Sequence, residues 1–165
     1  MLIWRIPITL FNPNRFERYV FIKFQTTSLR MSDLHTNLTL PSDPQNVTKV
    51  EPFVQDVATR YNLSPDTQGN ILISLTEAVT NAILHGNHAD QSKCVSISLR
   101  HQKDALSISV SDEGTGFDPD NVPDPTCPEF LEKCGGRGLY LMQNLSDECR
   151  FKRGGSTVEM RFRLD

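Results

Sequence analysis

Apolar residues recur at helical spacing through the middle of the chain. Between Ser64 and Gly86 they fall every three or four positions, which predicts one long amphipathic helix with a buried face. Ser64 is a good N-cap, Pro65 suits the first helical position, and Gly86 is typical of a helix end. The apolar residues on the predicted buried face are Ile71, Leu72, Leu75, Ala78, Val79, Ala82 and Ile83.

A strand and another helix are predicted before this long helix. Residues 34–40 alternate in part, which favours a first strand at a sheet edge. Asp43-Pro44 repeats the cap-plus-proline signal and opens a helix that runs to about Asn62. Pro52 lies within this helical pattern, so a late start or a kink is expected.

Strict alternation of apolar and polar residues predicts four more strands. Residues 95–99 and 106–110 each place apolar side chains on one face and serines on the other, with a polar turn at 101–104 between them. The strands at 148–153 and 157–164 flank Gly154-Gly155, which is typical of a hairpin turn. Such clean alternation indicates one covered face and one wetter face, as in an antiparallel sheet.

The segment between these two pairs of strands is predicted to hold one short helix. Residues 112–135 contain four prolines, too many for a regular element, and a helix is expected from Gly138 to about Leu145. The order is then strand, helix, helix, strand, strand, loop, helix, strand, strand. We therefore expect an α/β (α+β) two-layer sandwich, with a mixed, mainly antiparallel sheet and about three helices on one face.

Charge divides the chain into two parts. The net charge of the 165 residues is −3, but residues 1–30 carry five basic residues against Glu17 alone, so the remaining 135 residues carry −7. An acidic domain argues against direct nucleic acid binding. No apolar run reaches about 18 residues, so no membrane span is expected. The four cysteines show no C-x-x-C pairing, which favours reduced thiols in the cytoplasm.

Residues 1–30 also differ from the rest in aromatic content. Met31 opens a segment that is itself compatible with a protein start, so we expect 1–30 to be an N-terminal extension and 31–165 to be the functional domain. The other interpretation is a real N-terminal strand or docking segment, because residues 19–24 have good strand chemistry.

Polar residues that could take part in catalysis or binding form a second stripe along the predicted long helix. Glu77, Asn81 and His85 are spaced i, i+4, i+8 and border the apolar face. A carboxylate, an amide and an imidazole in line at a core edge suit the wall of a cleft. Taken alone, the spacing is equally that of ordinary surface residues on an amphipathic helix.

Two glycine motifs follow downstream. Asp112 ends a predicted strand and can accept a hydrogen bond from an exocyclic amine, while Gly114 and Gly116 let the backbone approach a flat ring. A plain turn is the alternative. Residues 135–139 run from a glycine cluster into a helix, whose positive end favours an anion. No Gly-Lys-Ser/Thr occurs there, so it is not a Walker P-loop.

Together the three motifs resemble a known family. E-x-x-x-N on a helix, D-x-G-x-G after a strand and G-x-G-L before a helix are similar to the Bergerat-type ATP-binding fold (GHKL) of gyrase, the heat-shock chaperone, histidine kinases and mismatch-repair ATPases. Residues 77–86 and 136–142 most resemble the bacterial anti-sigma-factor serine/threonine-protein kinases. The resemblance covers about residues 34–164 and leaves 1–30 unexplained.

The resemblance implies a role for each motif residue. Glu77 matches the general base that accepts a serine proton, and Asn81 matches the Mg²⁺ ligand on the phosphates. Asp112 matches the acceptor for the adenine amine, helped by a threonine that corresponds to Thr157. The other implied ATP-binding residues are Gly114 and Gly116 near the base, and Gly136, Arg137, Gly138 and Leu139 by the phosphates.

The function implied is that of an ATP- and Mg²⁺-dependent kinase that sequesters a sigma factor and phosphorylates a serine on an antagonist protein, with a possible homodimer. One departure stands out: some relatives carry an arginine near the terminal phosphate where this chain has Cys134. The alternative is a non-catalytic ATP-binding module that acts by nucleotide-dependent association. Residues 119–134 are expected to form a mobile lid.

Overall fold

The structure is a computed structural model that describes residues 35–118 and 137–164. The expectations for the extension at 1–30 and the lid at 119–134 lie outside the described residues, as do those for Cys134 and Gly136. No helix within the described part of the chain is both long and apolar enough to cross a membrane.

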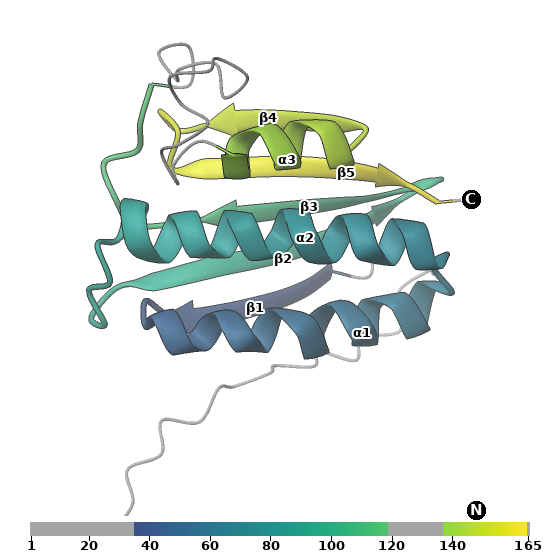
Figure 1. Cartoon of the computed structure of the whole chain (residues 1–165), viewed down its shortest axis with the longest axis horizontal. Coiled ribbons are helices and arrows are strands. Elements are labelled where there is room, and N and C mark those ends of the chain that lie inside the picture. Colours follow the sequence, from purple (N-terminus) through teal and green to yellow (C-terminus); the bar gives the residue numbers. More distant parts are fainter. Residues whose placement is uncertain (1–34, 119–136, 165) are drawn as a thin grey trace, which may run out of the picture.

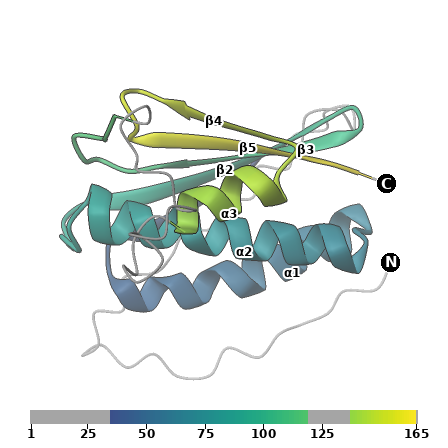
Figure 2. The same cartoon turned by 45° about the horizontal axis from the view of Figure 1, so that its top comes forward.

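In the described residues, five strands form one sheet in the order β1-β2-β3-β5-β4, and all four neighbouring pairs run antiparallel. Three α-helices of the described part of the chain cover one face of this sheet, with α2 in the middle (Figures 1 and 2). The predicted two-layer sandwich is confirmed. The strands are β1 (His35–Pro41), β2 (Cys94–Gln102), β3 (Ala105–Ser111), β4 (Glu148–Lys152) and β5 (Thr157–Arg163), and the helices are α1 (Val50–Tyr61), α2 (Pro65–Asn81) and α3 (Arg137–Leu145).

The first helical segment begins late, as its proline requires. Asp43 caps a 3₁₀ turn, η1 (Pro44–Lys49), by accepting a hydrogen bond from the Gln45 N–H at 2.9 Å. The α-helical pattern starts only at α1, which places Pro52 in the first turn of that helix. A proline causes no loss there, because the first N–H groups of a helix have no intrahelical partner.

The long central helix changes form near its end. Ser64 caps α2 by accepting from the Thr67 N–H at 3.2 Å, as predicted. The helix then widens into a π-helical turn, η2 (Ala82–Gly86), in which the Asn87 N–H donates to the Ala82 carbonyl at 2.8 Å. The α-helical spacing of the sequence did not predict this turn. π turns inside helices are frequent at functional sites.

The core lies between the helices and one face of the sheet. Its strand residues are the alternating apolar positions predicted from the sequence, and they are at most 8% exposed. The opposite face is polar: one cross-strand row runs Thr39, Ser96, Ser111 and Thr157 from β1 to β5. The core strand residues are Leu40, Val95, Ile97, Leu99, Leu106, Ile108, Val110, Val158, Met160 and Phe162.

Candidate nucleotide-binding site

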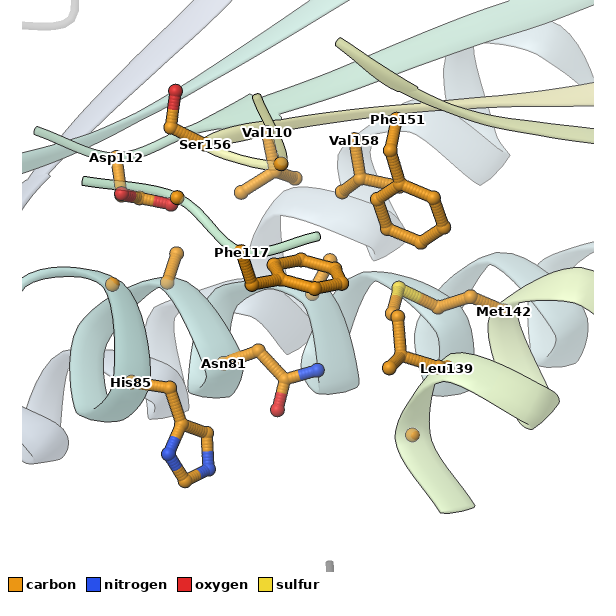
Figure 3. A pocket seen from close by; sticks show the side chains of 16 residues that line it. Asn81, His85, Val110, Asp112, Phe117, Leu139, Met142, Phe151, Ser156 and Val158 are labelled. Atoms are coloured by element: carbon orange, nitrogen blue, oxygen red, sulfur yellow. The ribbon is translucent and has the colours of Figure 1, made fainter. Parts of the chain in front are cut away.

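A cavity of about 330 Å³ opens between α2, α3 and the ends of β3 and β5. This volume falls in the range of small-molecule sites, which are mostly apolar with a few placed polar groups. Figure 3 shows the arrangement: aromatic and aliphatic side chains form most of the wall, with Asp112 and Ser156 on the side of the strands and Asn81 and His85 on α2 and the turn that follows it. The apolar lining includes Val110, Phe117, Leu139, Met142, Phe151 and Val158, and the polar lining includes Asn81, His85, Asp112 and Ser156.

Asp112 is held at the end of β3 by the backbone on both sides. Its N–H donates to the Ser156 carbonyl at 3.1 Å, and its Oδ1 accepts from the Gly114 N–H at 2.8 Å. Partial burial raises the pKa of the Asp112 carboxyl, and the hydrogen bond from Gly114 opposes this shift. The carboxyl group is therefore an oriented acceptor in a cavity wall that is otherwise largely apolar.

Two glycines allow the backbone to close around this carboxylate. A Cβ on Gly86 would lie 2.4 Å from Cγ of Asp112, and a Cβ on Gly114 would lie 2.1 Å from the Gly86 carbonyl oxygen. No larger residue fits either position without movement. Gly86 thus does more than end a helix, because it makes room for the carboxylate predicted to bind adenine.

Asn87 was missed as a site residue by the sequence analysis. Its side chain is fully buried, and its Nδ2 donates to Ser42 Oγ at 2.7 Å and to the Cys94 carbonyl at 3.0 Å. Its Oδ1 accepts from the Glu113 N–H at 2.8 Å. Asn87 therefore links the loop that follows Asp112 to Ser42, which lies between β1 and η1, and to the first residue of β2. The only signal in the sequence was a polar residue directly after a helix end.

The other side of the cavity is formed where the start of α3 meets α2. A Cβ on Gly138 would lie 2.7 Å from Glu77 Oε2 and 3.3 Å from Asn81 Nδ2. The side chains of Glu77 and Asn81, two of the three residues in the predicted polar stripe, therefore converge on this glycine. Asn81, Gly138 and Leu139 line the cavity, while Glu77 lies at its border beside Gly138. Arg137 is exposed at the first position of α3.

The residues present suit magnesium bound together with phosphates. In residues 35–118 and 137–164, no cluster of three His, Cys, Asp or Glu side chains could hold a metal alone. Mg²⁺ usually keeps several waters and takes only one or two protein oxygens in addition to substrate phosphates. The amide oxygen of Asn81, with the Glu77 carboxylate nearby, fits that donor set.

The structure does not bring Thr157 to the cavity. Its hydroxyl lies 2.9 Å from Ser111 Oγ, on the face of the sheet opposite the helices. The preceding residue, Ser156, lines the cavity instead, and its hydroxyl donates to the Arg153 carbonyl at 3.0 Å. The difference is one residue of strand register, which moves a side chain to the other face of a sheet.

Two aromatic residues of the wall were also absent from the predicted site. The rings of Phe117 and Phe151 meet edge to face, with their centroids 5.4 Å apart. Gly116, with φ of +76°, turns the chain so that Phe117 follows the glycine motif into the cavity. Phe151 comes from β4, and no motif in the sequence pointed to it.

This fold and cavity define a nucleotide-binding domain of the ATPase type. Residues 40–162 match the model of the histidine kinase-like ATPase domain, and the chain belongs to this family. The resemblance inferred from the three sequence motifs is confirmed.

Within this family, the chain is similar to several serine-protein kinases. The chain is similar to the serine-protein kinase RsbW of Bacillus subtilis, with 33% identity over 76% of this chain and 83% of that protein. RsbW of Bacillus licheniformis is also 33% identical, over 73% and 79% of the two chains, and RsbW of Listeria innocua is 25% identical, over 80% and 90%.

A solved structure shares the fold. The crystal structure of the RsbU and RsbW domains of a Mycobacterium tuberculosis protein superposes with a TM-score of 0.59 at 18% identity. The match covers 79% of this chain but only 32% of that longer one.

Proposed function

We propose that this protein is an ATP-dependent serine-protein kinase of the anti-sigma type. One observation carries the proposal: the Glu77 carboxylate and the Asn81 amide converge on Gly138 at the start of α3, at the border of the cavity that holds Asp112. A base, a metal ligand and a helix N-terminus together are what phosphoryl transfer requires. The similarity to three serine-protein kinases supports this assignment.

The cavity itself would take the adenine. Asp112 accepts a hydrogen bond from the exocyclic amine, and the apolar wall covers the ring. A guanine presents a carbonyl oxygen at the corresponding position, so the ionised carboxylate repels it. Adenine is therefore preferred.

In the proposed transfer of the γ-phosphoryl group from ATP to serine, each polar residue has one role. The Oγ of the acceptor serine attacks the γ-phosphorus, the bond from that phosphorus to the bridging oxygen of ADP breaks, and the serine proton passes to Glu77. Asn81 would hold Mg²⁺ together with the phosphates, and this ion would neutralise phosphate charge. The start of α3, at Arg137 and Gly138, would place the positive end of a helix dipole near the same charge.

The proposed location and partners of the protein rest on its resemblance to the anti-sigma-factor kinases. The protein would act in the cytoplasm, sequester a sigma factor and phosphorylate a serine on its antagonist, and a homodimer is compatible with this role. We further propose that residues 1–30 are an extension to a functional domain at 31–165, and that the domain makes no direct contact with nucleic acid.

Labelling with radioactive ATP tests the proposal. The purified protein is incubated with [γ-³²P]ATP, Mg²⁺ and fractionated proteins of its native host, and labelled proteins are hydrolysed to identify the phosphoamino acid. We expect label on serine of one small protein. If ATP binds but no protein is labelled, the better description is a non-catalytic module that works by nucleotide-dependent association.

A further inference from the structure

Four large apolar side chains are exposed in the described part of the chain: Ile73 (45%), Leu84 (41%), Phe117 (39%) and Tyr140 (43%). Phe117 belongs to the cavity wall. Ile73 and Leu84 lie on the central helical segment, in α2 and in η2, and the nucleotide cavity uses neither of them.

Helical spacing places these two residues on the same side of the helix as the proposed general base. Ile73 comes four residues before Glu77, and Leu84 comes seven residues after it. Thr80, partly exposed, lies between Glu77 and Leu84 on this side. We call Ile73, Glu77, Thr80 and Leu84 the α2 stripe. Figure 1 shows α2 between α1 and α3, with one side turned away from the sheet.

We propose that the α2 stripe is the docking surface for the protein substrate, and that it binds an extended segment with apolar side chains on both sides of the acceptor serine. This inference rests on the proposed kinase function. The serine hydroxyl must come within hydrogen-bond distance of Glu77, so the chain that carries the serine must cross this side of the helix.

The dimensions favour a polypeptide occupant. Leu84 lies eleven positions after Ile73, which corresponds to roughly 16 Å along a helix. An extended segment of about six residues spans this distance at roughly 3.3 Å per residue. With its serine beside Glu77, such a segment covers Ile73 with a flank of about two residues and Leu84 with a flank of about three, and removes both apolar side chains from water.

Kinetics with matched variants test the docking surface. The probe is the host protein that the wild type labels on serine from [γ-³²P]ATP, purified and assayed at saturating ATP. For Ile73→Ser and Leu84→Ser we expect the KM for this protein to rise about tenfold each, the effect of losing one buried apolar contact. Their kcat and their ATP affinity stay within about twofold of wild type, because neither residue lines the cavity.

Tyr140→Ser is the control. It removes a side chain of similar exposure from α3, two residues after Gly138 and thus on the side of that helix turned away from Glu77. Its KM should equal that of wild type. Denaturation curves check that all three variants fold.

Three other outcomes would overturn the inference, and they can be told apart. If no host protein is labelled, the kinase function fails and the docking surface fails with it. If the substrate is labelled but Ile73→Ser and Leu84→Ser keep the wild-type KM, only the docking surface is wrong. If sedimentation shows that these variants dissociate a wild-type dimer, a second copy of the chain is the occupant.

Discussion

The ionised carboxylate of Asp112 lowers the free energy of unfolding of the protein. Its pKa is raised above the ordinary value of 3.8, chiefly because partial burial disfavours the charged form. For an acid whose folded pKa exceeds its unfolded pKa, the charged form destabilises folding at every pH above the folded value. The penalty declines as the pH falls through the folded pKa and vanishes below about 3.8. Its proposed function, adenine recognition, gives a reason to keep such a residue.

Asp112→Asn should therefore change the free energy of unfolding and the ATP affinity in opposite directions. We expect a higher free energy of unfolding than wild type at neutral pH, with the gain shrinking as the pH is lowered toward 4. We also expect a loss of roughly 1–3 kcal/mol in ATP binding, because the adenine amine then faces a poorly matched amide. Chemical denaturation and calorimetry measure the two effects.

Asp90→Asn makes the same chemical change at a contrasting position. A hydrogen bond from the Ser92 hydroxyl lowers the pKa of Asp90, so this variant should gain no stability at neutral pH. Equal gains in Asp90→Asn and Asp112→Asn would contradict the assignment of the penalty to burial of Asp112.

Asn87, unlike Asp112, is expected to stabilise the fold through its buried hydrogen bonds. Asn87→Ala leaves three former partners without their bonds, at Ser42, the Cys94 carbonyl and the Glu113 N–H. Roughly 1–3 kcal/mol is lost for a buried group left unsatisfied, so we expect the free energy of unfolding to fall by at least about 2 kcal/mol. Urea denaturation of wild type and variant at neutral pH measures the loss, and a change below about 0.5 kcal/mol would show that the bonds are unimportant.

At the scale of elements, the start of α3 is fitted to the side chains of α2. A Cβ at Gly138 would contact the flexible end of Glu77 rather than backbone, so the carboxylate moves and the fold stays. Gly138→Ala should leave the free energy of unfolding unchanged or raise it by up to about 1 kcal/mol, since alanine is the better helix former. The kinase rate should fall at least about tenfold, because the base is displaced. Stability and initial-rate assays on one preparation distinguish this from general damage.

The elements that the sequence predicted well are those set by local chemistry. Ser64 and Asp43 cap their helices through bonds to residues two or three positions away, and strict alternation identified the buried faces of β2 and β3. The π turn η2 and the role of Asn87 depend on contacts between distant segments, which periodicity does not record. The placement of Thr157 also depended on strand register, where one position decides the face.

At the scale of the whole molecule, the cavity joins the two halves of the fold. Its walls come from α2 and β3, which precede residue 119, and from α3, β4 and β5, which follow residue 136. A ligand that bridges these elements binds only the folded state, so it must stabilise the whole domain.

ATP should therefore raise the thermal midpoint of the protein. At an ATP concentration one hundred times Kd, linkage adds about 2.7 kcal/mol to the free energy of unfolding, and GTP at the same concentration should add much less. Differential scanning calorimetry with each nucleotide measures the two increments. Equal increments from ATP and GTP would contradict adenine recognition by Asp112.

The central claim is that Glu77 acts as the base for phosphoryl transfer and not as a nucleotide ligand. The direct measurement is the effect of Glu77→Gln on ATP affinity and on substrate phosphorylation, in the same preparation. Glutamine keeps the shape and removes the negative charge, so we expect ATP affinity within a few-fold of wild type and phosphorylation slower by roughly 10²-fold or more. A glutamine variant that phosphorylates its partner as fast as wild type would show that Glu77 is not the base.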